Sequence, residues 1–338
     1  MAKASEPSHG TNLERTHAAL IAYPRFRELH QAIQLCQRLS NLAGEPQCMS
    51  LEGRTGAGKS TLVRTYADSF QRTETPEGTG IPVLYLEVPS PAGIKDLASA
   101  VLKRMGDPAY ERGTRATLTM RLIGLIQACG VELVILDDFH HLIDSETNHV
   151  LGEVSEWLKY VIKETGVPFL VVGIEGKVEL ILQANPQLSR LFAARETLQP
   201  FRWETAQPET IQEFAHFVEY VEQAVEKPLS VEVRRTELLY RIHYATDGVV
   251  GNVMNLLRFA ALLCELQVQR DIGLAILSQA FQQRLAKHLS RKCDPFSEAA
   301  TVRFTPSAPA PPMEPEKSPK GKRRSKRIPS IAETLTTQ

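Results

Sequence analysis

Leu51-Glu52-Gly53-Arg54-Thr55-Gly56-Ala57-Gly58-Lys59-Ser60-Thr61 is the stretch that decides the fold, because it reads G-x-x-x-x-G-K-S. In this phosphate-binding loop, glycines let the backbone curl so that several N–H groups point at one phosphate. Lys59 is expected to reach the β- and γ-phosphates of a nucleotide, and the Ser60 hydroxyl to ligate Mg²⁺. A strand-like run at 47–51 precedes the loop and helical spacing at 60–70 follows it. The expected cofactors are therefore ATP and Mg²⁺.

A second motif lies further along the chain, where the apolar run 131–137 ends in the carboxylates Asp137 and Asp138. Such a strand end beside a phosphate loop places Asp137 to hold Mg²⁺ through water and Asp138 to orient the attacking water. The residues expected to hold the nucleotide are Gly53, Arg54, Thr55, Gly56, Ala57, Gly58, Lys59, Ser60, Thr61 and Asp137. The second acid is usually Glu in ring-forming ATPases, so the shorter Asp138 predicts slow hydrolysis.

Strand-like and helical runs alternate around these motifs. Strands are expected at 47–51, 83–88, 131–137 and 168–173, and helices at 60–70, 94–105, 116–129 and 148–164. This alternation predicts an α/β fold, a three-layer P-loop core whose parallel sheet is covered on both faces. After Trp203 the strands stop, and helical runs at 207–225, 236–245, 249–267 and 275–288 predict a C-terminal helical lid.

Before the core, a helical segment broken at Tyr23-Pro24 carries an apolar stripe: Phe26, Leu29, Ile33, Cys36 and Leu39. After the lid, prolines and a cluster of Lys and Arg predict a disordered basic tail. The expected organisation is a flexible N-terminus at 1–12, a helical segment at 13–46, the nucleotide-binding core at 47–203, the lid at 204–292 and the tail at 293–338.

The composition bounds the class of protein. The 338 residues carry 39 Lys and Arg against 39 Asp and Glu, a formal net charge of zero. No apolar run reaches the roughly 18 residues of a membrane helix, and no signal-peptide core is present at the start. Five cysteines without C-x-x-C spacing indicate free thiols in a reducing compartment. We therefore expect a cytoplasmic protein.

Three further positions bear on catalysis. Arg190 could reach a neighbouring subunit's nucleotide and neutralise transition-state charge, with Arg195 as the alternative; an ordinary surface arginine is the other interpretation. At the end of strand 168–173, Glu175 would repel a γ-phosphate, so a sensor there is in doubt. Asn252 stands where many such ATPases have a sensing arginine, and we interpret it as a helix-start residue.

Together these motifs resemble the AAA+ ATPases of the TniB/TnsC family, bacterial regulators of DNA transposition. The resemblance covers about residues 13 to 290. It rests on Tyr23-Pro24-Arg25, on the phosphate loop, and on Asp137-Asp138-Phe139-His140-His141-Leu142, which is similar to the family's D-E-x-Q-H-L. Gln187-Leu188-Ser189-Arg190-Leu191-Phe192 and Gly248-Val249-Val250-Gly251 also fit. In this chain Asp138 replaces the family's Glu, and His140 replaces its Gln.

The resemblance implies a protein that oligomerises with ATP on duplex DNA, as a ring or helical filament, and recruits a transposase of the TniA/TnsB type. It also implies a target selector of the TniQ type as a partner. Candidate DNA-phosphate contacts are Lys95, Lys103, Arg104, Arg112, Thr114 and Arg115. A solvated helical face explains these residues equally well.

The basic tail leaves its own alternatives open, since Lys317, Lys320, Lys322, Arg323, Arg324, Lys326 and Arg327 could hold DNA, dock on an acidic transposase surface or serve solubility. Two rival functions also stay open. One is a helicase-loader-type ATPase whose client is a protein ring. The other is a DNA scaffold that binds ATP without hydrolysing it, which Asp138 and the missing sensors make credible.

Overall fold

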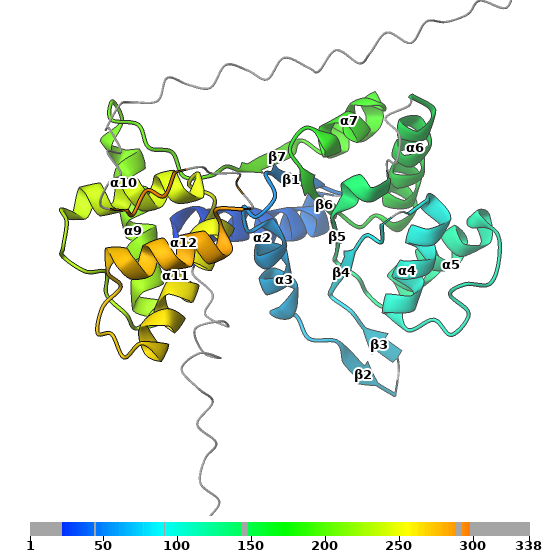
Figure 1. Ribbon diagram of the computed structural model, residues 1–338. Helices are drawn as coiled ribbons and strands as arrows, with labels where there is room; N and C mark the ends of the chain where they lie inside the picture. Colours follow the sequence, from blue (N-terminus) through cyan, green and yellow to red (C-terminus); the bar gives the residue numbers. More distant parts are fainter. Residues whose placement is uncertain are drawn as a thin grey trace, which may run out of the picture. The chain divides into compact units, whose positions relative to one another are not determined.

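The computed structural model describes residues 22–43, 45–76, 78–90, 92–142, 148–287, 289 and 293–297. Its centre is a five-stranded parallel sheet with the strand order β4-β5-β6-β1-β7 (Figure 1). The strands are β1 (Met49–Gly53), β4 (Val83–Glu87), β5 (Leu133–Asp137), β6 (Phe169–Ile174) and β7 (Ala194–Leu198). Because β1 pairs with both β6 and β7, the phosphate loop leaves the sheet between two neighbours, where α/β folds bind their ligands.

The strands β5 and β6 are apolar except for Asp137 and Gly173, because both faces of the sheet are covered. On β5, Leu133 and Ile135 belong to one hydrophobic cluster, whereas Val134 and Leu136 belong to the other. The first cluster also contains residues of α2 (Pro24–Ala43), α3 (Lys59–Asp68) and the lid. The second contains residues of the helices α4 to α7. The predicted three-layer α/β core is confirmed.

The predicted helices of the core and the lid are present, with ends that differ by a few residues. In the core they are α3, α4 (Ile94–Met105), α5 (Arg115–Ala128) and α6 (Asn148–Thr165); the core also contains α7 (Lys177–Gln183), α8 (Pro186–Leu191) and the 3₁₀ helix η1 (Phe139–Leu142). In the lid they are α9 (Pro208–Val225), α10 (Arg235–Thr246), α11 (Val250–Leu266) and α12 (Leu274–Arg284). Figure 1 shows α4, α5 and α6 grouped together, and α9 to α12 grouped around α11.

Sequence patterns missed three elements that carry little apolar signal. The edge strand β7 reads ARETL and is half exposed. A hairpin of β2 (Thr73–Thr75) and β3 (Gly78–Gly80) lies in the stretch interpreted as a polar loop. The short helix α7, which begins after Gly176, was not among the expected helices. Each of these elements is short, and its formation depends on contacts with distant parts of the chain more than on a local apolar pattern.

The apolar stripe of α2 is confirmed at four of its five positions, but Leu39 is 41% exposed and its inclusion is wrong. A helix of 3.6 residues per turn continues the buried face through Gln37 and Ser40. Both are polar and hydrogen-bonded: Gln37 Nε2 donates to Glu132 Oε2 at 2.7 Å, and Gln47 N donates to Ser40 Oγ at 2.8 Å. The period of the helix therefore outweighs the apolar character of Leu39.

Residues 293–297, which the sequence assigned to the tail, pack on the lid. Phe296 is buried against Phe281 of α12 with ring centroids 6.2 Å apart. The Arg241 guanidinium donates to the carbonyl of Pro295 at 3.1 Å. The basic cluster beyond this segment, and the N-terminal residues 1–21, lie outside the described residues.

None of the described helices is by itself long and apolar enough to cross a membrane. The helices α10 and α11 reach that length and hydropathy only as a pair, which is bent by 115° at the break between them.

The turn between α10 and α11 joins the lid to the core. Gly248 has a φ of 64°, and its carbonyl accepts a 2.9 Å hydrogen bond from Phe201 N, just beyond β7. The imidazole of His243 also contacts Phe201, with Nε2 2.8 Å from the Phe201 carbonyl oxygen. The position needs glycine because an added Cβ would lie 2.1 Å from that oxygen.

Gly248→Ala is therefore expected to lower the melting temperature by several degrees. A backbone clash in a buried left-handed turn costs on the order of 2–3 kcal/mol. Gly152→Ala is the matched control, because Gly152 lies inside α6 and no atom lies within 4 Å of the added Cβ. There alanine should stabilise slightly. Equal melting temperatures of the two variants in thermal denaturation would contradict this account of the turn.

His243 predicts a pH dependence of stability. Burial lowers its pKa in the folded state below the usual value, opposed by the hydrogen bond to Phe201. As the pH falls below about 6.5, the unfolded chain therefore binds the proton first. The contribution of neutral His243 to the free energy of unfolding should be complete above that pH. It should decrease as the pH falls towards 5. Urea denaturation of His243→Gln should show a weaker decrease, while His216→Gln, an exposed control on α9, should match the wild type.

Candidate functional site

The phosphate loop is shaped as an anion cradle. Gly56 and Gly58 have φ values of 79° and 99°. Gly58 precedes α3, whose N-terminus has no side-chain cap. The first N–H groups of a helix have no partner within it, and they carry partial positive charge. The end of α3 can therefore bind a phosphate group directly.

Lys59 is held inside this loop. Its Nζ donates to the carbonyls of Gly53 and Arg54 at 2.7 and 3.0 Å, and the residue is 7% exposed. Burial lowers the pKa of Lys59, and nearby carboxylates, led by Asp137 and Asp138, oppose that shift. The ammonium thus lies next to the carboxyl end of β1. Acidic side chains lie near it, and two backbone carbonyl oxygens accept its hydrogen bonds.

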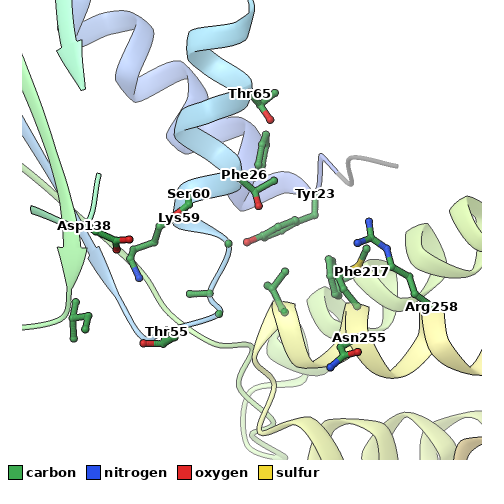
Figure 2. Close-up of a pocket in the computed structure, with 18 of the residues that line it drawn as sticks. Tyr23, Phe26, Thr55, Lys59, Ser60, Thr65, Asp138, Phe217, Asn255 and Arg258 are labelled. Atoms are coloured by element: carbon green, nitrogen blue, oxygen red, sulfur yellow. The ribbon is translucent and has the colours of Figure 1, made fainter. Parts of the chain in front are cut away.

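A cavity of about 930 Å³ opens from the loop, a size that suits a nucleotide. At one end it is lined by loop residues, including Lys59 and Ser60, and by Asp138. At the other end it is lined by residues of α2, α9, α11 and α12. Figure 2 shows this division: Lys59, Ser60 and Asp138 lie together, while Asn255 and Arg258 project from the lid helix.

The second end of the cavity has an aromatic wall. Tyr23 and Phe26 line it, and the Tyr23 ring meets Phe217 of α9 edge-on with centroids 5.2 Å apart. Burial raises the pKa of Tyr23 to about 12, so its hydroxyl stays protonated at neutral pH. Flat apolar walls of this kind suit a nucleobase. The sequence singled out Tyr23-Pro24 without assigning this role, because the helices that complete the wall are far away in the chain.

The lid touches the loop through backbone atoms. Gly251 N donates to the Gly56 carbonyl at 2.8 Å, and a Cβ at Gly251 would lie 2.8 Å from the same oxygen. Gly248 and Gly251 are thus each required by a close backbone approach, one to Phe201 and one to the phosphate loop. The Gly248-Val249-Val250-Gly251 element of the sequence is the joint between lid and core.

The two acids at the end of β5 lie in different surroundings. Asp137 is fully buried; its Oδ2 accepts from the Tyr85 hydroxyl at 3.0 Å, and its Oδ1 accepts from Asp138 N at 2.9 Å. Arg64 Nε in turn donates to the Tyr85 hydroxyl at 2.8 Å. Asp138 lines the cavity in a left-handed conformation with a φ of 53°. Of the pair, Asp138 is the one whose side chain borders the ligand space.

The residues present suit Mg²⁺ that arrives with a nucleotide. Within the described part of the chain, no group of three or more His, Cys, Asp or Glu side chains could hold a metal ion. Ser60 lines the cavity, and the buried Asp137 carboxylate lies close enough to Lys59 to oppose the lowering of its pKa by burial. Mg²⁺ is commonly held by few protein oxygens together with phosphates and water. Ser60 and Asp137 as its ligands stay a prediction.

The two arginines considered for a neighbouring subunit's site differ in their contacts. Arg195 is engaged, with an ion pair to Glu179 and a 2.6 Å hydrogen bond to Ser189 Oγ. Arg190 on α8 is exposed, and among the described residues it forms no ion pair. It lies outside the cavity of its own chain. A role for Arg190 would therefore be exercised in another subunit.

Two arginines that the sequence did not single out line the cavity from the lid: Arg258 of α11 and Arg284 of α12. Burial lowers the pKa of Arg258, and Arg284 stacks on Phe259 with its guanidinium carbon 4.1 Å from the ring centroid. Asn252 does not line the cavity, and its Nδ2 donates to the carbonyl of Thr246 at the end of α10, at 3.1 Å. Glu175 is exposed and accepts from Gln199 at 2.9 Å.

The candidate DNA contacts are exposed on α4, on α5 and in the connection between them. Arg115 pairs with Glu153 at 3.6 Å, and Thr114 caps α5 by accepting from Thr117 N at 3.2 Å. Lys103 lies over the Tyr110 ring, with its Nζ 5.2 Å from the centroid. The other members of the set, Lys95, Arg104 and Arg112, form no ion pair within the described ranges.

Comparison with known proteins agrees with this geometry. The sequence matches the family described as "Bacterial TniB protein" over residues 16–204. No curated protein sequence matched the chain in a separate search.

Solved structures with a similar fold include three archaeal proteins. The ORC2 protein of Aeropyrum pernix, in ADPNP–ADP complexes, is 15% identical, with a TM-score of 0.56 over 82% of this chain and 74% of that one. Cdc6p from Pyrobaculum aerophilum is 14% identical, with a TM-score of 0.57 over 80% and 71%. The Aeropyrum pernix ORC1 protein in complex with DNA is 15% identical, with a TM-score of 0.53 over 80% and 68%. At these identities the likeness establishes the fold alone.

Proposed function

The chain belongs to the TniB family, and on that premise we propose that it is an ATPase that assembles on duplex DNA and regulates transposition. ATP binding favours assembly, and slow hydrolysis drives disassembly. The assembled form recruits a transposase of the TniA/TnsB type and answers to a target selector of the TniQ type.

The observation that carries this proposal is the cavity between phosphate loop and lid. Its two ends match the two halves of a nucleotide, with backbone N–H groups and Lys59 for phosphates and aromatic walls for the base. The hydrogen bond between Gly251 and Gly56 means that a ligand in the loop acts on the lid directly. Nucleotide occupancy can therefore bias the position of the lid, which is what a switch requires.

The proposed chemistry divides among a few side chains. Lys59 leaves its carbonyl partners to reach the β- and γ-phosphates, and the N–H groups of residues 56–61 surround them. Bound Mg²⁺ would neutralise phosphate charge, with Ser60 and Asp137 as the residues that hold it. Asp138 orients the attacking water from the cavity wall. As Asp is one methylene shorter than Glu, its reach is less and turnover is slow.

DNA contact is proposed for the exposed cations of α4 and the segment before α5. Lys95, Arg104 and Arg112 are the strongest candidates, because Arg115, Lys103 and Thr114 have partners in the same chain. A few phosphate contacts per subunit would suffice, since a multimer adds them together. One structural relative, ORC1, was solved with DNA, which supports this class of partner.

A second candidate function is a scaffold that binds ATP without turnover. The observation in its favour is the end of β6, where Gly173 offers no side chain and the carboxylate of Glu175, which accepts from Gln199, would repel a γ-phosphate. An ATP turnover assay with and without duplex DNA separates the two candidates.

Lys59→Ala is expected to weaken nucleotide binding at least about 10-fold, since it removes a charge-assisted contact with phosphate. ATP-dependent assembly on duplex DNA should be lost with it. Binding is measured with a fluorescent nucleotide, and assembly by electron microscopy with a slowly hydrolysed ATP analogue.

Lys177→Ala on α7 is the control for this experiment, since Lys177 lies outside the cavity. If Lys59→Ala still assembled on DNA in response to ATP as the wild type does, the proposed mechanism would fail.

Arg190→Ala is expected to lower the rate of ATP hydrolysis by about 10³-fold or more, as removal of an arginine finger does, and to change nucleotide affinity little. Arg270→Ala, on an exposed lid loop, is the control. Mixing Arg190→Ala with Lys59→Ala subunits provides the sharper readout. If Arg190 acts on a neighbour, the mixture should regain activity that neither variant has alone. An inactive mixture of two folded variants that assemble together speaks against the role.

A further inference from the structure

His140 occupies the space beside the end of β6. It lies in η1, three residues after Asp137, and its ring lines the cavity with Asp138 and Lys59. A Cβ added at Gly173 would lie 3.4 Å from His140 Nδ1. The same Cβ would meet Val178 Cγ2 first, at 2.6 Å, so Val178 of α7 and the His140 imidazole together fill the space into which a side chain from the end of β6 would project. Glu175, the nearest polar residue on that strand end, is exposed and bonded to Gln199.

The two nitrogens of the His140 ring differ. Nδ1 is buried and has no hydrogen-bond partner among the described residues. Its neighbour His141 is different, with Nδ1 3.1 Å from the Val88 carbonyl oxygen. An orphaned buried N–H is rarer in proteins than an under-satisfied acceptor. The proton of neutral His140 therefore belongs on Nε2, which leaves the ring as a hydrogen-bond donor through that atom.

The charges around the ring favour the neutral form. Burial lowers the pKa of His140, and His141 and Lys59 lower it further, while Asp138 and Asp137 raise it. At neutral pH the group is then a donor without a full charge. Such a donor can approach an anion while adding no cation next to Lys59.

We propose that His140 detects the terminal phosphate of a bound nucleoside triphosphate, by donating a hydrogen bond from Nε2 to a γ-phosphoryl oxygen. The inference rests on the proposed nucleotide site. In this arrangement η1, and not β6, supplies the contact with the γ-phosphate. The contact lies beside Asp138, where the attacking water would stand. The aromatic wall of Tyr23 and Phe217 lies at the opposite end of the cavity, so the base is not its target.

The test is the ratio of two affinities. The dissociation constants of ADP and of the non-hydrolysable triphosphate AMP-PNP are measured by calorimetry, each with Mg²⁺, for the wild type and for the variants His140→Ala and His140→Gln. His140→Ala should bind AMP-PNP at least about 10-fold more weakly, as loss of a hydrogen bond to a charged group predicts, and ADP within about twofold of the wild type. His140→Gln keeps an N–H donor and should retain most of the preference.

His216→Ala, an exposed histidine on α9, is the matched control, and thermal denaturation verifies that each variant folds. The proposal is overturned if His140→Ala changes both affinities equally or neither, or if His140→Gln behaves as His140→Ala does. A wild-type protein that binds neither nucleotide overturns the proposed function itself, and with it the role of His140. The two failures are therefore distinguishable.

Discussion

The hydrogen bond from Gly251 N to the Gly56 carbonyl is the contact on which the rest of the site depends. It joins the first turn of a lid helix to the phosphate loop through backbone atoms alone, at 2.8 Å. Side chains can change rotamer to absorb a displacement, but two backbones at this distance cannot. Any rearrangement of the loop around a phosphate must therefore be transmitted to α11. Gly248 fixes the other end of the same turn against Phe201, so the lid is held at two points.

The packing around this joint makes the aromatic end of the cavity part of the core. Tyr23, Phe201 and Phe217 come from the start of α2, from the segment after β7 and from α9, and their rings lie 4.8 to 5.5 Å apart. They belong to the hydrophobic cluster that also covers one face of the sheet. A base seated against Tyr23 would border Phe217 as well, which also lines the cavity, while Phe201 supports both rings from the side of the core. The cavity couples the stability of the lid to ligand binding, because binding to the folded form alone stabilises it.

What the sequence could predict was local in character. The loop, the acids of β5 and the buried strands each carry their signal in consecutive residues, and their arrangement is confirmed by the fold. The edge strand β7, with Arg195 and Glu196 at its centre, carries no such signal, since its pairing with β1 defines it. Arg258 and Arg284 were missed for the same reason: nothing in their helices distinguishes a cavity-facing arginine from a solvated one. Leu39 shows the reverse error, where apolar character overrode the helical period.

The division of labour between the two acids follows from burial. Asp137 is enclosed, and both its oxygens accept hydrogen bonds, from the Tyr85 hydroxyl and from Asp138 N. These hydrogen bonds fix the position of the carboxylate. It can orient a metal ion through water, but it cannot easily change its own position. Asp138 and His140 border the open cavity, and each lacks the reach or charge of the groups that usually serve such sites. At the loop end of the cavity Lys59 lies beside the two acids Asp137 and Asp138, while Arg258 and Arg284 line the cavity from the lid. Under the proposed function, an arginine from a neighbouring subunit adds positive charge at the transition state, and hydrolysis then depends on assembly.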